Sequence, residues 1–420
     1  MYDWANSAFA TTIMAAVLPE FYSSVAGATL NRTTATSYWG YSNTIAMLLI
    51  AIAAPLLGAI SDHSGAKKKF LAGFAFFGIV ATGLLIGAGN GMWLYASILY
   101  IFGRVGFGCG NIFYDSLLPH VAKKEEIDRV SAEGYAYGYL GGGLLLALNL
   151  FMILKPDTFG IPGAEWASRI SFLSVALWWA LFSIPIFKNV AEPSVVVARN
   201  ESLNPLTAGY QRLKRTFRDI RRFKELAKFL IAFWLYNDGV GTIIIMAVIF
   251  GAEIGIGRTH LIGAILMVQF IGIPFTVLFG RLPKRLGPKK SILLALGVYT
   301  IVTILGYFMQ KPAHFWLLAF LVSMVQGGTQ ALSRSMYASM LPASKSAEFF
   351  GFYNVSSKFS GIIGPALFAV VGQLTGTGRI SIISIIVFFL AGAGILTTVN
   401  HEKGMKNAIT EDEQEKIRAG

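Results

Sequence analysis

Long apolar segments alternate with polar ones along the whole chain. A helix needs ~20 mostly apolar residues to cross the ~30 Å of hydrocarbon in a bilayer. On that measure the pattern predicts twelve membrane-spanning helices, at residues 4–26, 38–61, 70–89, 92–118, 130–154, 167–187, 229–251, 260–282, 291–309, 314–337, 350–373 and 379–399. We therefore predict an all-α integral membrane protein with six-helix halves at 1–187 and 229–399. A basic cytoplasmic linker at 188–228 joins the halves, and a cytoplasmic tail at 400–420 follows them.

The composition excludes an ordinary soluble protein, because 55% of the residues are hydrophobic and only 14% are charged. The formal net charge of +13 would suggest nucleic acid if basic residues gathered on a soluble face. They lie instead in short loops between apolar segments, so we predict no nucleic-acid partner. A single cysteine, Cys109, and the absence of metal-ligand spacing predict neither a disulfide framework nor a metal site, and we expect no cofactor.

The distribution of Lys and Arg predicts the orientation in the membrane. Of the 35 basic residues, 27 fall in or beside the loops after the even-numbered spans and in the tail. Six fall in the loops after the odd-numbered spans, and Arg104 and Lys358 lie inside predicted spans. Positive charge stays on the cytoplasmic side, so both termini should be cytoplasmic. In a bacterium this would be an inner-membrane protein.

An internal repeat supports two related halves. The loop segment Gly58-Ala-Ile-Ser-Asp62-His-Ser-Gly65 recurs 222 residues later as Gly280-Arg-Leu-Pro-Lys284-Arg-Leu-Gly287. A repeat of about half the chain length between apolar spans is typical of duplicated transporters. Setting Tyr2-Asp3 against Asn237-Asp238 places the counterpart of Lys228 upstream of Met1, so we expect the natural chain to begin further upstream.

The first copy of the loop, with the pattern Gly-x-x-x-Asp-x-x-Gly-x-Lys-Lys, resembles the loop signature of the major facilitator superfamily. Arg104-Val-Gly-Phe-Gly108-Cys-Gly110 is similar to a pattern in the fourth helix of that superfamily. The opening Tyr2-Asp3-Trp4-Ala5-Asn6-Ser7 and the segment Tyr114–Pro119 resemble one branch, the unknown major facilitator family. That branch is related to fungal vacuolar effluxers that release amino acids during autophagy, which implies the superfamily fold and small-solute transport.

Three ionisable residues are predicted near the membrane midplane, since at ~1.5 Å per residue they lie ~14–18 Å into their spans. Arg104 presents a planar fork of donors suited to a carboxylate or phosphate, or else forms a fixed strut. Asp238 is predicted to couple transport to protons, since carboxylates at this depth often form proton relays; the alternative is a permanent ion pair with Arg104 or Lys358. Lys358 either binds an anionic group or balances Asp238.

Other polar residues within spans are candidates for the same site. Asp3 and Asn6 lie three apart and share a helix face. Asp3 either lines the cavity, as a second proton-coupling group, or satisfies donors at the helix end. Gln326 and Gln330 are candidate solute ligands, although hydrogen bonding between helices also explains them. Gln269 and Asn354 are explained in the same way.

A conformational gate is predicted at the cytoplasmic end of the second span. The resemblance implies that Asp62, flanked by Gly58 and Gly65, docks on the N-terminus of a second-half helix, expected to be that of span 11. The second copy has Lys284 in place of this carboxylate, so the role belongs to the first half alone. Asp115 and Glu133 are further gate candidates, against the alternative of ordinary loop salt bridges.

The sequence thus predicts a secondary transporter that works by alternating access, coupled to protons, for a small zwitterionic or anionic solute. The resemblance favours an amino acid. The alternatives are a lipid or drug translocator, or a membrane scaffold on the same fold. Leu213, Phe217 and Ile220 in the basic linker follow helical spacing and predict an interfacial helix on anionic lipids. We expect a monomer, and no constellation of residues indicates an enzyme.

Overall fold

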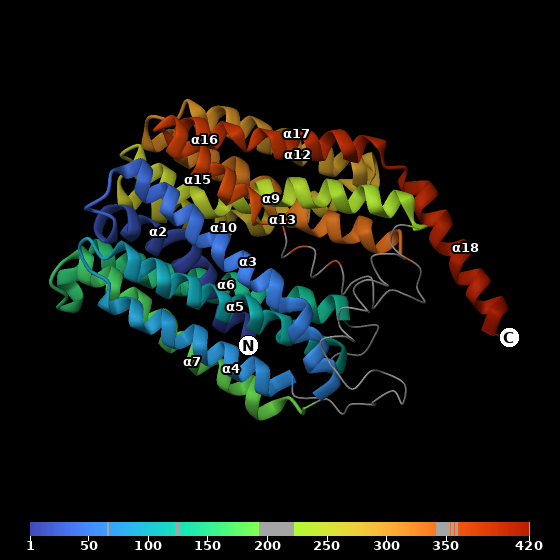
Figure 1. The fold of residues 1–420 in the computed structure, drawn as a ribbon, viewed down its shortest axis with the longest axis horizontal. Coiled ribbons are helices and arrows are strands. Elements are labelled where there is room, and N and C mark those ends of the chain that lie inside the picture. Colours follow the sequence, from blue (N-terminus) through green and yellow to red (C-terminus); the bar gives the residue numbers. More distant parts are fainter. Residues whose placement is uncertain are drawn as a thin grey trace.

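The computed structural model describes residues 1–64, 67–121, 127–192, 222–341 and 360–419, together with Tyr353 and Ser357. Over this part of the chain the regular structure is helical, and ten helical segments are long and apolar enough to cross a membrane. Two other helices occupy predicted spans, namely α3 (Arg32–Ser64) and the shorter α15 (Ile363–Thr375). Figure 1 shows the helices running side by side along the long axis of the molecule.

The helix boundaries follow the predicted spans to within a few residues wherever both are described. In the first part of the chain the helices are α3 (Arg32–Ser64), α4 (Lys67–Leu84), α5 (Trp93–Val121), α6 (Ile127–Leu154) and α7 (Ala164–Asn189). In the second part they are α9 (Lys224–Glu253), α10 (Arg258–Arg281), α11 (Pro283–Leu286), α12 (Pro288–Tyr307), α13 (Pro312–Ser339), α15 (Ile363–Thr375), α16 (Gly378–Ser384) and α17 (Ile386–Thr398). The tail forms the helix α18 (His401–Ala419).

The first span is not a uniform α-helix. It runs as α1 (Tyr2–Ala8), the π-helical stretch η1 (Phe9–Ala16), α2 (Val17–Phe21) and a second π-helical stretch η2 (Tyr22–Ala26). Pro19 lacks the N–H that would bond the carbonyl of Ala15, which favours a widened turn before it. Hydropathy predicts a span at 4–26 but carries no sign of this irregularity.

The helices form two groups, one before residue 192 and one after 222. Within the first group α1 packs on α6 and α7, and α4 packs on α5 and α7. Within the second, α9 packs on α17 and α10 packs on α13. The groups meet where α3 lies against α15 and α9, and where α6 lies against α10. In Figure 1 the blue-to-green group lies below the yellow-to-red group.

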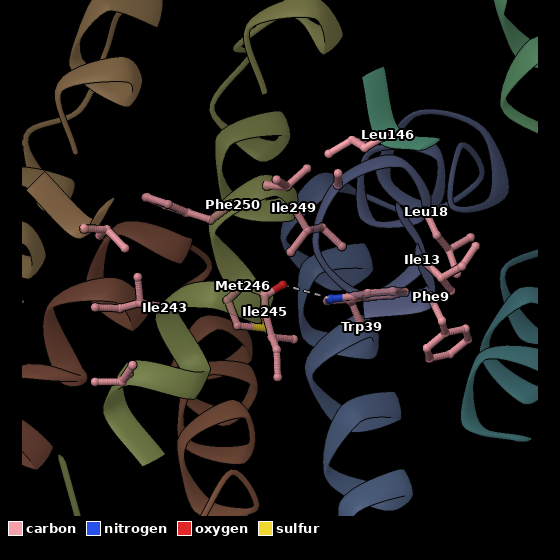
Figure 2. Packing of buried hydrophobic residues seen from close by; sticks show 14 of the residues in the cluster. Phe9, Ile13, Leu18, Trp39, Leu146, Ile243, Ile245, Met246, Ile249 and Phe250 are labelled. Atoms are coloured by element: carbon pink, nitrogen blue, oxygen red, sulfur yellow. Dashed lines mark hydrogen bonds between the residues drawn. The ribbon is translucent and has the colours of Figure 1, made fainter. Parts of the chain in front are cut away.

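Trp39 anchors the contact between the two groups. Its indole is fully buried and stacks near Tyr100, with 4.3 Å between ring centroids. From α3 the indole Nε1 donates a hydrogen bond of 3.3 Å to the carbonyl of Ile245 on α9, as Figure 2 shows. An indole that packs with one face and donates with its edge joins the groups by both apolar contact and a hydrogen bond.

Glycine allows the closest helix contact in the first group. A Cβ placed on Gly106 of α5 would lie 2.5 Å from both the Cα and the N of Gly78 on α4. Backbones approach this closely in membranes only where side chains are absent. The position therefore tolerates no larger residue without separating α4 from α5.

We predict that Gly106→Ala destabilises the protein even though alanine favours a helix by up to ~1 kcal/mol over glycine. The new methyl group overpacks the α4–α5 contact, at a cost of ~1–3 kcal/mol. Thermal unfolding in detergent should show a lower Tm. Gly73→Ala is the matched control, since nothing lies within 4 Å of a Cβ there, and its Tm should be unchanged or higher. Equal Tm values for the two variants would contradict the prediction.

Candidate functional site

A cavity of about 840 Å³ lies between the two groups of helices. Its walls come from α1, η1, α5 and α7 on one side and from α9 and α13 on the other. The cavity reaches the ends of α5 and α7, at Val121 and Asn189. Its polar lining residues are Asp3, Asn6, Ser7, Asn111, Tyr114, Asp115, Asn189, Asn237, Gln330, Arg334 and Ser357.

The wall from the first group is built by two antiparallel rows of polar side chains. Asp3 and Asn6 lie three apart on α1, and Asn111 and Tyr114 lie three apart on α5. The Nδ2 of Asn6 donates to the Oδ1 of Asn111 at 2.7 Å. The hydroxyl of Tyr114 donates to the Oδ2 of Asp3. The helical spacing of three on both helices thus matches the residues pair by pair, and the carboxylate of Asp3 is held at the cavity wall.

The wall from the second group carries the opposite charge. Gln330 and Arg334 lie four apart on one face of α13, and both line the cavity. Asn237 of α9 also lines it, and its Nδ2 donates to the Oγ of Ser360. The cavity therefore has an acidic side at Asp3 and a basic side at Arg334.

Asp238 lies next to Asn237 but behind the cavity wall, with a residue exposure of 3%. Its Oδ1 accepts backbone hydrogen bonds from Gly361 at 2.9 Å and Gly364 at 3.0 Å, and its Oδ2 accepts one from Ile363 at 3.2 Å. Ile363 begins α15, so the carboxylate satisfies N–H groups that have no partner inside the helix. In the internal repeat, Asp238 occupies the position equivalent to Asp3. The carboxylate of Asp3 accepts from a tyrosine hydroxyl, whereas that of Asp238 accepts from backbone N–H groups.

Arg104 is buried at 9% exposure and lines neither of the two cavities described here. Its guanidinium contacts the sulfur of Met14 and, at 3.5 Å, that of Met47. Among the described residues it forms no ion pair with Asp238. Phe107, one turn along α5, lines the large cavity, so Arg104 lies one turn beyond the cavity's inner end.

Gln326 and Gln269 line a second, largely apolar cavity of about 100 Å³, whose walls come from the second group and from Ala15 of η1. Its other walls include Phe250, Phe315 and Val322. Gln326 is only one helical turn from Gln330, but the two side chains face different cavities. The structure therefore does not bring together the two glutamines that the sequence groups as solute ligands.

The predicted gate is described only in part. Asp115 is exposed and lines the large cavity near Tyr114. Gly58 and Asp62 fall in α3 and Glu133 in α6, but their side-chain surroundings lie outside the described part, as does Gly65. Lys358, Asn354 and the predicted interfacial helix of the linker also lie outside the described residues.

Residues that sequence reasoning missed hold the groups together at the opposite end from the cavity mouth. The Nε of Arg258, on α10, lies 2.5 Å from the Oε2 of Glu20, on α2. The carboxylate of Glu253 accepts hydrogen bonds from the hydroxyl of Thr33 at 3.1 Å and from the N–H of Gly378 at 2.8 Å. We call this the closed end. Glu20 lies inside an apolar span, and this position is the signal from which a buried partner could have been predicted.

Three further residues that line the large cavity are not among the predicted solute ligands, namely Asn111, Tyr114 and Arg334. Arg334 lies near the end of the predicted span 314–337. The sequence pattern therefore groups its charge with those of the cytoplasmic loop that follows. Tyr114 was noted only as part of a family pattern. Within the described part of the chain, no three His, Cys, Asp or Glu side chains come together as a metal site would require.

Residues 25–409 of the chain match the sequence family described as vacuole effluxer Atg22-like. The chain belongs to this family. The chain is 37% identical to the MFS-type transporter YxiO of Bacillus subtilis over 411 residues, which cover 96% of this chain and 94% of YxiO. It is 24% identical to autophagy-related protein 22 of Yarrowia lipolytica, over 88% of this chain and 76% of that protein.

Solved structures with the same fold are transporters of the major facilitator superfamily. A crystal structure of a D-xylose–proton symporter superposes with a TM-score of 0.68, over 96% of this chain and 97% of the symporter, at 16% identity. A bacterial homologue of the lysosomal transporter Spinster, inward-facing and occupied, gives a TM-score of 0.65 over 96% of each chain, at 11% identity. This Atg22-like protein is therefore an integral membrane transporter of the MFS type.

The ion pair at the closed end of this Atg22-like transporter leads to a prediction. Removing one partner of a buried ion pair leaves the other charge uncompensated, at a cost of ~3–5 kcal/mol. We predict that Glu20→Gln favours opening of the closed end. In a Cys109→Ala background, a cysteine at the buried interface position Ser37 should react with a maleimide at least ~10-fold faster in Glu20→Gln than with Glu20 intact.

The matched control is Glu165→Gln, which removes an ion pair with Arg169 inside α7. A pair of this kind contributes only ~0.3–0.5 kcal/mol, so the labelling rate at position 37 should not change. The exchanged pair Glu20→Arg with Arg258→Glu should return the rate toward that of the native pair. Unchanged labelling in Glu20→Gln would show that the ion pair does not hold the closed end.

Proposed function

We propose that this Atg22-like transporter moves a small zwitterionic or anionic solute, with an amino acid favoured, by alternating access between two six-helix halves, 1–187 and 229–399. The observation that carries the proposal is a cavity between the two helix groups with Asp3 on one wall and Arg334 on the other. Both termini are proposed to be cytoplasmic, in an inner membrane if the host is bacterial. The cavity then opens toward the cytoplasm in this state.

The chemistry of the two walls suits a solute with separated charges. The carboxylate of Asp3, held by Tyr114, can accept hydrogen bonds from an ammonium group. The guanidinium of Arg334 offers paired donors for a carboxylate. Asn6, about one helical turn from Asp3, and Gln330, about one turn from Arg334, add neutral donors and acceptors to the two walls. A volume of about 840 Å³ is within the usual range of ~300–1,000 Å³ for small-molecule sites.

The preference for an amino acid rests on the resemblance to fungal vacuolar effluxers.

The carboxylates proposed for proton coupling are Asp3, at the cavity, and Asp238, behind its wall. Arg104 is proposed as an anion ligand in the opposite state. Among the described residues, its guanidinium hydrogen-bonds only to thioether sulfurs, and the halves must separate near it when the closed end opens. Lys358 and Gln326 remain proposed solute ligands, and the linker is proposed to contact anionic lipids. We propose a monomer.

Reconstitution into proteoliposomes tests the function directly. Radiolabelled amino acids and organic acids are supplied with and without an imposed pH gradient, and uptake and counterflow are measured. We expect saturable counterflow of at least one amino acid and net uptake that responds to the gradient. A folded protein that moves none of these solutes would refute the proposal, and transport of lipid or drug probes alone would favour a translocator.

Arg334→Gln tests the basic wall. Loss of a charge-assisted, bidentate contact should lower Vmax/KM for a carboxylate-bearing solute by at least ~10-fold, mainly through a higher KM. Arg285→Gln, an exposed substitution on α11, is the matched control and should transport like the native protein. An unchanged KM in Arg334→Gln, with normal expression and Tm, would remove Arg334 from the site.

A further inference from the structure

The eleventh predicted span contains a break next to the cavity. The helix α15 begins only at Ile363, and Gly361 before it has φ +111°, a conformation that residues with a Cβ rarely adopt. Ser357 lines the cavity and Ser360 lies in the turn that precedes α15. The break thus leaves the first N–H groups of α15 to be satisfied from outside the helix.

Two adjacent residues of α9 hold this break from both sides. Asn237 faces the cavity and donates to the Oγ of Ser360, which itself donates to the carbonyl of Ser357 at 2.8 Å. Asp238 accepts the three N–H groups of Gly361, Ile363 and Gly364. We call Asn237, Asp238 and the turn 360–364 the α9–α15 junction.

The far side of α15 carries the contact with the other helix group. The hydroxyl of Ser37 on α3 donates to the carbonyl of Ala369 at 3.0 Å, and that of Thr44 donates to the carbonyl of Ile362 at 3.3 Å. Tyr41 donates to the Oε1 of Gln373 at 2.7 Å. A shift of α15 would therefore change the contacts between the groups on the side of the closed end.

We propose that Asp238 is a positioning residue: its carboxylate fixes the start of α15, and the α9–α15 junction transmits occupancy of the cavity at Asn237 to the α3–α15 contact. This inference rests on the proposed solute site in the large cavity. A solute that hydrogen-bonds Asn237 competes with Ser360 for its amide. The turn that begins α15 then loses one of its two attachments to α9, and the balance between closed and open arrangements of α3 and α15 changes.

The test measures the distance between α3 and α15 in the full-length protein. Spin labels are placed at the exposed positions Ile52 and Leu374 in a Cys109→Ala background, in proteoliposomes. In the absence of solute, Asp238→Asn should broaden the distance distribution and shift its mean by ~3 Å or more, the rise of two helical residues. An asparagine presents one NH₂ group toward backbone donors and so loses part of the attachment. Asp157→Asn, in the exposed 3₁₀ helix Pro156–Phe159, is the matched control and should leave the distance unchanged.

Two further variants keep the test informative. Gly364→Ala leaves the carboxylate in place but puts a methyl group 2.8 Å from the Oδ1 of Asp238 and closer still to the Oγ1 of Thr242, both on α9, so it should also displace the start of α15 and shift the distance if Asp238→Asn does not fold. Asn237→Ala retains the three N–H bonds to Asp238 but removes the attachment to Ser360, so its resting distance should already lie near that of the solute-bound native protein. With a mixture of the common L-amino acids, therefore, the distance in Asn237→Ala should no longer respond, and counterflow should lose Vmax more than affinity.

The outcomes separate this inference from the proposed function. A native distance in both Asp238→Asn and Gly364→Ala would overturn the positioning role. A native response to amino acids in Asn237→Ala would overturn the transmission step. If amino acids leave the native protein unchanged while Asp238→Asn shifts α15, the positioning role stands and the proposed solute class fails. If Asp238→Asn loses only the response of uptake to a pH gradient and keeps the native distance, Asp238 is a proton-coupling group alone.

Discussion

Polar groups inside the helices of this protein must be satisfied by other parts of the protein, since hydrocarbon offers no hydrogen bonds. This constraint accounts for the contacts that organise the structure. Glu20 forms an ion pair with Arg258, and Asp238 accepts hydrogen bonds from N–H groups at the start of α15. Asn6 donates a hydrogen bond to Asn111 within one wall of the cavity. Each pairing joins helices that hydropathy alone would leave free to rotate or slide.

The two ends of the bundle use these pairings differently. At the closed end, charged and hydroxyl side chains cross between the helix groups, and Trp39 adds a large buried contact with α9. Around the cavity, the pairs Asp3–Tyr114 and Asn6–Asn111 stay within the first group, and Asn237–Ser360 stays within the second. Among the described residues, cross-links at one end and pairs confined to each wall at the other agree with one state of the proposed alternating-access cycle.

Arg104 and Asp238 show why depth in a span is an incomplete guide to a solute site. Both were predicted near the midplane, and both are buried in the structure. Neither lines the large cavity, because Arg104 lies one turn beyond its inner end and Asp238 turns away toward α15. Gln326 and Gln330, one turn apart, face different cavities. Depth follows from counting residues along the chain, whereas the direction of a side chain depends on how its helix is rotated against its neighbours.

The sequence by itself determined the helical class, the described spans to within a few residues and the likeness to the major facilitator superfamily. It could do so because the bilayer imposes length and apolarity on each segment separately. It also supplied Asp3, Asn6 and Gln330 as cavity residues. Only the tertiary structure decided which polar residues meet: Asp3 with Tyr114, and Glu20 with Arg258 more than 200 residues away. The physical reason is that a mostly apolar helix has no strongly marked face, so its rotation and partners are set by packing and by the pairing of its few polar groups.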